Sequence, residues 1–107
     1  MAFAGLWEVW RDRTDPDAEP LRTCVIVTTS ANDLMAPIHD RMPVVLAPEN
    51  WAAWLDPATD AAIVSGLMVP APSEWFEAFP VSTLVNKVSN DGPHLLNRLP
   101  PPPAPAG

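Results

Sequence analysis

The sequence predicts a mixed α+β fold in which the strands of a curved sheet or open barrel carry short helices on their outside. Runs of apolar and aromatic residues alternate with short segments in which apolar residues recur at helical spacing. Prolines and polar turn residues separate these segments at short intervals. With 107 residues the chain has room for one small domain, which we expect over residues 1–98, followed by a proline-rich disordered tail over 99–107.

Two strands are expected first. Residues 3–10 are rich in aromatic side chains and contain no turn signal, which predicts a strand buried on both faces. Residues 11–20 are polar and predict a solvated loop, and a second strand follows over 21–29. Cys24 lies inside the apolar run of this strand, where a free cysteine is most often a small buried hydrophobe. We therefore expect Cys24 not to be a nucleophile.

A short helix and a third strand come next. Ser30 is a suitable N-cap for a helix over 31–36. Pro37 would end that helix, because its ring clashes with the preceding turn and its nitrogen carries no hydrogen. Pro43 precedes the third strand, over 44–46.

The remaining chain predicts helices and one last strand. Pro48 suits the first turn of a helix whose core-facing side would carry Trp51, Trp54 and Leu55. A second helix is expected to begin at Asp56 and Pro57 and to end at Gly66 as its C-terminal cap. Ser73 is expected to cap a further turn over 74–79, and residues 80–85 predict a strand.

The charge of the chain argues against general binding to phosphate backbones. Thirteen acidic residues against six basic ones give a formal net charge of −7, so any contact with nucleic acid must be local. No apolar run approaches the roughly 18 residues of a membrane span, and no signal peptide is recognisable. We expect no membrane partner and a cytoplasmic location, which the single cysteine also fits.

Glu8 is the first candidate for chemistry. Alternation along the strand puts it on the same side as Leu6 and Trp10. A carboxyl group held among apolar side chains keeps its proton more readily and can act as an acid near neutral pH. The alternative is a structural carboxylate at a strand edge or in an ion pair with a nearby arginine (Arg11, Arg13 or Arg22), and the pattern alone favours that alternative.

His39 is the second candidate, because Pro37 and Pro43 stiffen the segment around it. Histidine is the usual proton carrier near neutral pH, and the adjacent Asp40 and Arg41 offer an acceptor and an anion-binding fork. The alternative, favoured by the pattern alone, is a structural histidine in a polar turn.

No cofactor and no metal are expected. The acidic and imidazole side chains do not follow a metal-binding spacing such as H-x-x-x-H or C-x-x-C. The five tryptophans are mostly expected in the core, with Trp7 and Trp10 as the candidates for stacking on unpaired bases.

Three blocks of sequence resemble the SOS response-associated peptidase (SRAP) family. They are FAGLWE at 3–8, the TTSAN and APIHDRMP blocks at 28–32 and 36–43, and a block that begins with PVS at 80–82 and ends with VN at 85–86. Their order and spacing are specific, and the resemblance extends from residue 2 to about residue 90.

The resemblance implies abasic-site processing in single-stranded DNA. Members of the family link an N-terminal cysteine covalently, as a thiazolidine, to the ring-opened sugar of an abasic site, and they have associated autopeptidase and lyase chemistry. By the same resemblance, Glu8 and His39 are the catalytic acid–base residues, and Thr28 and Arg41 lie near the DNA.

The sequence also departs from the family pattern, because Met1 is followed by Ala2 where a cysteine would stand. The early basic segment and the active-site asparagine of the family do not occur either. We therefore expect the C-terminal half of an SRAP domain, inactive alone, with abasic single-stranded DNA and a separate N-terminal half as candidate partners. The alternatives are an inactive truncated fragment, a non-catalytic interaction module, and a small hydrolase using His39 and Asp40.

Overall fold

A computed structural model describes residues 1–101. The chain divides between Phe76 and Glu77 into two compact units. The first unit contains the strands and the α-helices, and the second is built from turns and 3-10 helices. The predicted mixed α+β class is confirmed, as a set of small antiparallel sheets with short helices and without a closed barrel among the described residues.

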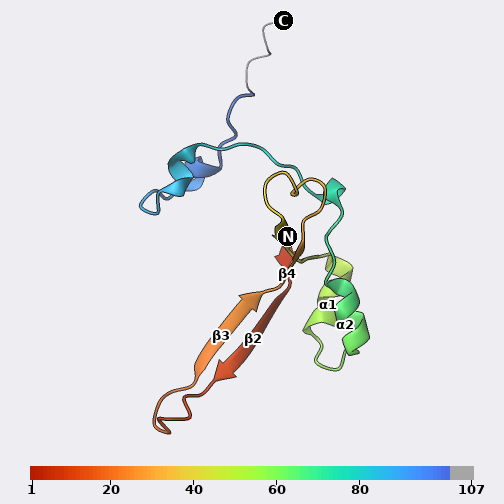
Figure 1. Cartoon of the computed structure of the whole chain (residues 1–107), viewed down its shortest axis with the longest axis vertical. Coiled ribbons are helices and arrows are strands. Elements are labelled where there is room, and N and C mark those ends of the chain that lie inside the picture. The colour runs from red at the N-terminus through yellow and green to blue at the C-terminus, as the bar shows by residue number, and fades with distance from the viewer. Residues whose placement is uncertain (102–107) are drawn as a thin grey trace, which may run out of the picture. The chain divides into compact units, whose positions relative to one another are not determined.

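The longest strands form a hairpin. Strands β2 (Gly5–Trp10) and β3 (Leu21–Ile26) pair antiparallel, from Gly5 opposite Ile26 to Trp10 opposite Leu21 (Figure 1). Aromatic and β-branched side chains favour this pairing. The connecting loop contains Asx turns, in which the carboxylates of Asp12 and Asp15 accept backbone N–H bonds.

Two shorter pairs complete the strands of this unit. Strand β1 (Ala2–Phe3) pairs with β6 (Val45–Leu46), and β4 (Thr28–Ser30) pairs with β5 (Arg41–Pro43). All pairs are antiparallel.

A triangle of backbone hydrogen bonds joins the three pairs. Ala4 separates β1 from β2, Val27 separates β3 from β4, and Val44 separates β5 from β6. Ala4 N–H donates to the Val44 carbonyl (2.8 Å), Val44 N–H to the Val27 carbonyl (2.9 Å), and Val27 N–H to the Ala4 carbonyl (2.9 Å). Each extended segment therefore changes its partner at one residue, and the strands bend there instead of continuing as one flat sheet.

The core lies at this three-way junction. Ala4, Val44 and Leu46 are buried together, and Val27, Trp54, Leu67 and Met68 pack against them. Every residue of β2 and β3 is instead exposed. The predicted burial of residues 3–10 on both faces was wrong, and so was the burial of Cys24, because neither the helices nor another strand of the described chain covers the hairpin.

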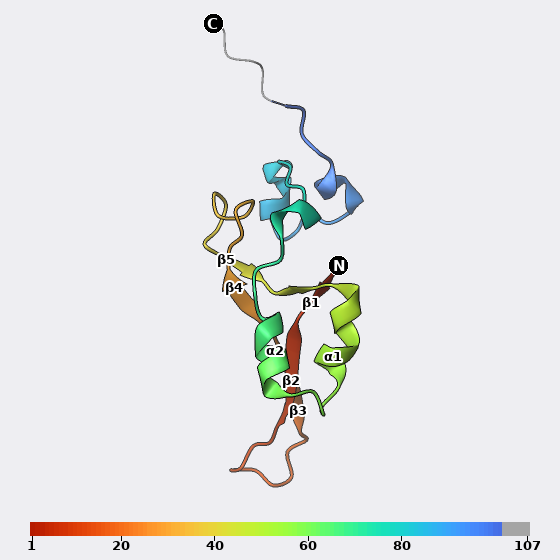
Figure 2. The same ribbon diagram turned by 90° about the vertical axis from the view of Figure 1, so that its right-hand side faces the viewer.

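The helices of the first unit follow β6. The 3-10 helix η1 (Pro48–Asn50) leads into α1 (Trp51–Leu55), and α2 (Ala61–Leu67) follows after a turn. Figure 1 shows both α-helices on one side of the hairpin, and Figure 2 views them from that side. Trp54 packs on the core as predicted, whereas Leu55 is exposed.

The ends of α2 differ from the prediction. Asp60, not Asp56, is the N-cap and accepts a hydrogen bond from Ala62 N–H (2.9 Å). Asp56 instead forms a turn with Ala58 N–H (2.9 Å). Gly66 lies within the helix, which Met68 ends.

The predicted helix over 31–36 is a series of turns. The Asn32 side chain accepts from Met35 N–H (3.0 Å) and donates to the Ala71 carbonyl (2.9 Å). Asparagine competes in this way with regular helical bonding. Ser73 is not a cap either: η2 (Ser73–Trp75) has Pro72 as its N-cap, and the Ser73 hydroxyl accepts from Leu34 N–H (3.3 Å).

The second unit contains η3 (Thr83–Asn86) and η4 (Pro93–Leu96). The strand predicted over 80–85 was wrong beyond a single bridge between Val81 and Arg98, because the Ser82 hydroxyl caps η3 by accepting from Leu84 N–H (3.2 Å). Arg98 also pairs with Glu77 (3.2 Å) and lies over the Phe79 ring. The predicted tail lies largely outside the described residues.

Candidate functional site

His39 lies in the turn that precedes β5, and Arg41 is the first residue of that strand. The His39 Nδ1 atom lies 3.0 Å from the Arg41 backbone nitrogen and 3.2 Å from Asp40 Oδ1. The first contact needs an unprotonated Nδ1, and the second needs a proton on it. One form of the ring therefore cannot make both contacts: the Nε2–H tautomer accepts from Arg41, and a ring with a proton on Nδ1 donates to Asp40.

The bond from the Arg41 N–H fits a neutral His39 ring that carries its proton on Nε2, because a neutral imidazole has one donor and one acceptor. The side chains of His39 and Asp40 are 66% and 91% exposed, so water screens their attraction and makes it weak. Both contacts use Nδ1, and Nε2 has no hydrogen-bond partner among residues 1–101.

Thr28 holds the side chain of Arg41. Arg41 Nη2 donates to the Thr28 carbonyl (2.9 Å) and lies 3.0 Å from the Thr28 hydroxyl. Because Thr28 is in β4 and Arg41 in β5, the pairing of these strands sets this contact. The other guanidinium N–H groups have no acceptor among residues 1–101, which leaves a donor edge for an anionic group.

Glu8 lies apart from this cluster, in the middle of the hairpin. Its pairing with Thr23 places it between the Leu6–Val25 and Trp10–Leu21 pairs on one face. This confirms the predicted neighbours of Glu8, but the side chain is exposed. No salt bridge joins Glu8 to an arginine, and no hydrogen bond joins it to His39, within residues 1–101.

The loop end of the hairpin forms an open hollow of about 840 Å³, and Glu8 is one of the residues that line it. Its lining is mostly polar and charged, from residues 8–14 and Thr23. Within it, hydrogen bonds from the Thr14 hydroxyl (2.6 Å) and the Thr14 backbone N–H (2.9 Å) lower the pKa of the exposed Asp12. Asp12 therefore stays ionised over a wider pH range than an ordinary aspartate.

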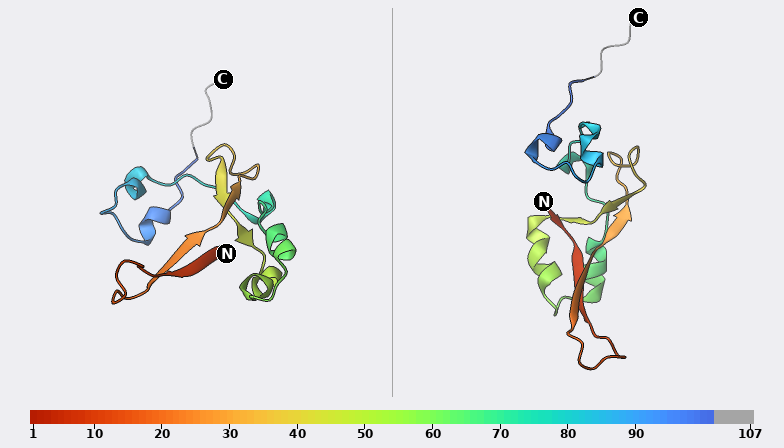
Figure 3. Two further views of the ribbon diagram at one scale, coloured as in Figure 1. Left: turned by 60° about the horizontal axis from the view of Figure 1, so that its bottom comes forward. Right: turned by 90° about the vertical axis from the view of Figure 1, so that its left-hand side faces the viewer.

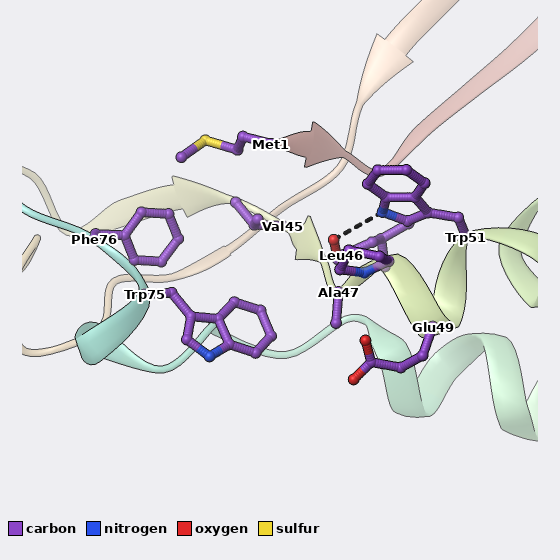
Figure 4. A pocket seen from close by; sticks show the side chains of 9 residues that line it. Met1, Val45, Leu46, Ala47, Glu49, Trp51, Trp75 and Phe76 are labelled. Atoms are coloured by element: carbon purple, nitrogen blue, oxygen red, sulfur yellow. Dashed lines mark hydrogen bonds between the residues drawn. The ribbon is translucent and has the colours of Figure 1, made fainter.

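A second hollow, of about 560 Å³, is apolar and contains none of the predicted site residues. Figure 4 shows Trp75, Phe76 and Met1 around it, with Glu49 as its one charged side chain. Trp51 Nε1 donates to the Leu46 carbonyl at its wall (2.9 Å).

The structure thus brings together three of the four predicted site residues: Thr28, His39 and Arg41. The sequence analysis missed the role of Asn32. Its side chain accepts from Met35 N–H in the turn that precedes His39, and it donates to the Ala71 carbonyl. The available signal was the residue type, because an asparagine just past a predicted strand favours a turn in which its side chain bonds to nearby backbone groups.

Neither a metal cluster nor a membrane helix is seen in the described part of the chain. No group of three or more His, Cys, Asp or Glu residues there is placed to hold a metal ion. No helix there is long and apolar enough to cross a membrane.

Comparison with known proteins gives a consistent match. The family model described as SOS response associated peptidase (SRAP) matches residues 1–88. The abasic site processing protein YoqW of Bacillus subtilis is 47% identical over 97 residues, which are 90% of this chain and 42% of YoqW. The abasic site processing protein HMCES of Gallus gallus is 35% identical over 97 residues, which are 90% of this chain and 28% of HMCES.

A solved structure shares the fold. The crystal structure of a protein from Bacteroides thetaiotaomicron matches with a TM-score of 0.77 and 29% identity, over 91% of this chain and 42% of that one. The chain spans less than half the length of these relatives. With a family model that covers most of its residues and relatives of this identity, the chain belongs to the SRAP family.

Proposed function

We propose that the chain takes part in processing abasic sites in single-stranded DNA and supplies the acid–base groups of the reaction. The observation that carries this proposal is the 47% identity to the abasic site processing protein YoqW across 90% of the chain. The turn that orients His39 and Arg41 supports it, because a fixed imidazole beside a guanidinium suits proton transfer next to a phosphate.

Each residue has a distinct part in this proposal. Opening the sugar of an abasic site moves a proton from the anomeric hydroxyl to the ring oxygen and exposes an aldehyde. His39 would take or give this proton at Nε2, and Glu8 would be the second acid–base group. Arg41 would bind the DNA phosphate, and Thr28 would position Arg41. The autopeptidase and lyase reactions would use the same acid–base groups.

The nucleophile must come from a different segment. A thiazolidine needs an amine and a thiol on adjacent carbons, as in an N-terminal cysteine. Cys24 is the only cysteine of the 107 residues, and its amine is tied up in a peptide bond. We therefore propose that the N-terminal half of an SRAP domain completes the site, in the cytoplasm, where thiols stay reduced.

A denaturing-gel assay on an abasic single-stranded oligonucleotide tests the proposal. The chain alone should give no heat-stable adduct, whereas the chain mixed with the N-terminal half of YoqW should give one. Glu8→Gln and His39→Ala should each slow crosslinking or its reversal by about 10²- to 10⁴-fold.

Matched variants separate chemistry from general damage. Glu19→Gln and His94→Ala change the same residue types elsewhere in the chain and should leave the rate unchanged. A heat-stable adduct from the chain alone, formed without reductant, would contradict the proposal.

A non-catalytic interaction module is the second candidate, and the exposed hairpin favours it. Binding of a protein partner with no crosslinking under any condition would support this function instead.

A further inference from the structure

The turn that precedes η4 contains an aspartate followed directly by a glycine. Asp91 is the only aspartate or asparagine of the sequence that has a glycine as its next residue. The pair lies in the second unit, in the loop that joins η3 to η4, which Figure 3 shows in blue. Asp91 is exposed, and Gly92 is half-buried. The aspartate is therefore open to water.

The side chain of Asp91 is folded back on the peptide bond that follows it. Gly92 N–H donates to Asp91 Oδ1 (2.8 Å), so the carboxylate lies against the backbone nitrogen of the next residue. Four other aspartates accept instead from the N–H two residues further on: Asp12, Asp15, Asp56 and Asp60. The difference matters chemically, because only the nitrogen of the next residue can close a five-membered ring on the side-chain carboxyl carbon.

The same turn favours glycine at position 92. Its φ of 128° lies in a region that residues with a side chain rarely adopt. The His94 ring also crowds this position, since a methyl group on Gly92 would come within 2.9 Å of His94 Nδ1. Glycine has no side chain to shield its own nitrogen. The turn therefore keeps the least hindered nucleophile next to the Asp91 carboxyl group.

We propose that Asp91 is a modification site, at which the chain converts spontaneously to an isoaspartyl linkage. In the first step the Gly92 nitrogen forms a bond to Asp91 Cγ, and the bond from Cγ to a protonated carboxyl oxygen breaks. That hydroxyl leaves as water with the proton of the Gly92 N–H, and a cyclic imide remains. Water then opens the imide at either carbonyl and gives aspartate or isoaspartate. The conversion needs no oxidant, metal or cofactor.

Isomerisation adds one carbon to the main chain directly before η4. Gly92 is the N-cap of η4, and its carbonyl accepts from Leu95 N–H (3.3 Å). On the other side, Asn90 donates to the Lys87 carbonyl through its backbone and to the Leu84 carbonyl through its side chain (2.9 Å each). Because both neighbours are held, the added carbon should break one of these contacts. The product presents an exposed isoaspartyl carboxylate, the chemical group that isoaspartyl methyltransferases esterify.

Ageing of the full chain at neutral pH, followed by proteolysis and mass spectrometry, tests the site. Isoaspartate separates from aspartate chromatographically at equal mass, and it accepts a methyl group from S-adenosylmethionine in the presence of an isoaspartyl methyltransferase. A synthetic peptide of residues 85–97 supplies the rate of the unstructured pair. We expect conversion at Asp91 at no less than about a tenth of the peptide's rate, because an exposed turn opens readily.

Two controls separate this reaction from general ageing. Asp91→Glu keeps the carboxylate and the glycine, but its ring would have six members, so the methyl-accepting product should fall below detection. Asp17 is the internal control, because it is exposed and the Ala18 side chain shields the next nitrogen, and it should stay unmodified over the same time. An unmodified Asp91 in a sample aged until the peptide has converted would overturn the proposal. Equal modification of Asp17, or methyl transfer that persists in Asp91→Glu, would also overturn it.

Discussion

His39 has two hydrogen-bond partners that exclude each other. The Arg41 backbone N–H requires a bare Nδ1, and the Asp40 carboxylate requires a protonated one. Protonation at Nδ1 therefore breaks a backbone contact of Arg41, the residue proposed to bind phosphate. At this scale, a proton on Nδ1 and the backbone bond of Arg41 exclude each other through one hydrogen bond.

Nitrogen NMR can test this coupling. The two ring nitrogens of neutral His39 should give the chemical shifts of the Nε2–H tautomer, because Nδ1 accepts the Arg41 backbone N–H bond. The other histidine, His94, is the internal control. A neutral ring with its proton on Nδ1 would contradict the assignment.

Asp12 offers a test of a single hydroxyl. Thr14→Val removes the hydroxyl that lies 2.6 Å from Asp12, so the pKa of Asp12 should rise toward its ordinary value of 3.8. Because the pKa is lowered in the folded state, the stabilisation is present above the unfolded value and is lost as pH falls through the folded one. A carboxyl-carbon NMR titration measures the change, and Thr23→Val should leave the Asp12 curve in place.

At the scale of elements, the sequence predicted the extended segments better than their surroundings. The segments predicted as strands over 3–10 and 21–29 are extended, but each is divided into two strands, at Ala4 and at Val27. Aromatic and β-branched residues favour the β2–β3 pairing whatever covers it. The exposure of these two strands could not be predicted from their own residues, because it depends on whether other segments of the fold pack against them. The predicted helix over 31–36 is absent, and Met35 N–H bonds to the side chain and the carbonyl of Asn32 instead of the Ala31 carbonyl that a helix would use.

Asn32 should be the residue on which the 31–40 turn depends. Asn32→Ala removes two hydrogen bonds of a partly buried side chain and leaves the Ala71 carbonyl without this donor. The loss should destabilise the first unit by about 1–3 kcal/mol, measured by urea unfolding. Asn97→Ala alters an exposed asparagine of the second unit and should cost much less. Equal losses would show that the turn does not depend on the Asn32 side chain.

At the scale of the whole molecule, the family could be recognised from three short blocks, and the match over residues 1–88 confirms it. The roles of Glu8, Thr28, His39 and Arg41 stay predictions. Sequence pattern could place these residues on strands and turns, but their grouping depends on how β4 and β5 pair, which is a long-range property. The three-way junction was likewise not visible in the sequence, because its hydrogen bonds are made by backbone groups that any residue supplies.

The junction at Ala4, Val27 and Val44 should control the stability of the first unit. Ala4 is fully buried where three pairs of strands exchange partners, so a larger side chain has no free volume to occupy. Ala4→Leu should destabilise the unit by about 1–3 kcal/mol through overpacking. Ala18→Leu makes the same change in the exposed loop of the hairpin and should have little effect.

Amide hydrogen exchange in the Ala4→Leu variant measures which strands are destabilised. Because each junction residue separates two strands, protection of the backbone amides from exchange should fall in β1, β4, β5 and β6 together. Loss of protection confined to β1 would show that the three strand pairs are independent and that the triangle does not join them.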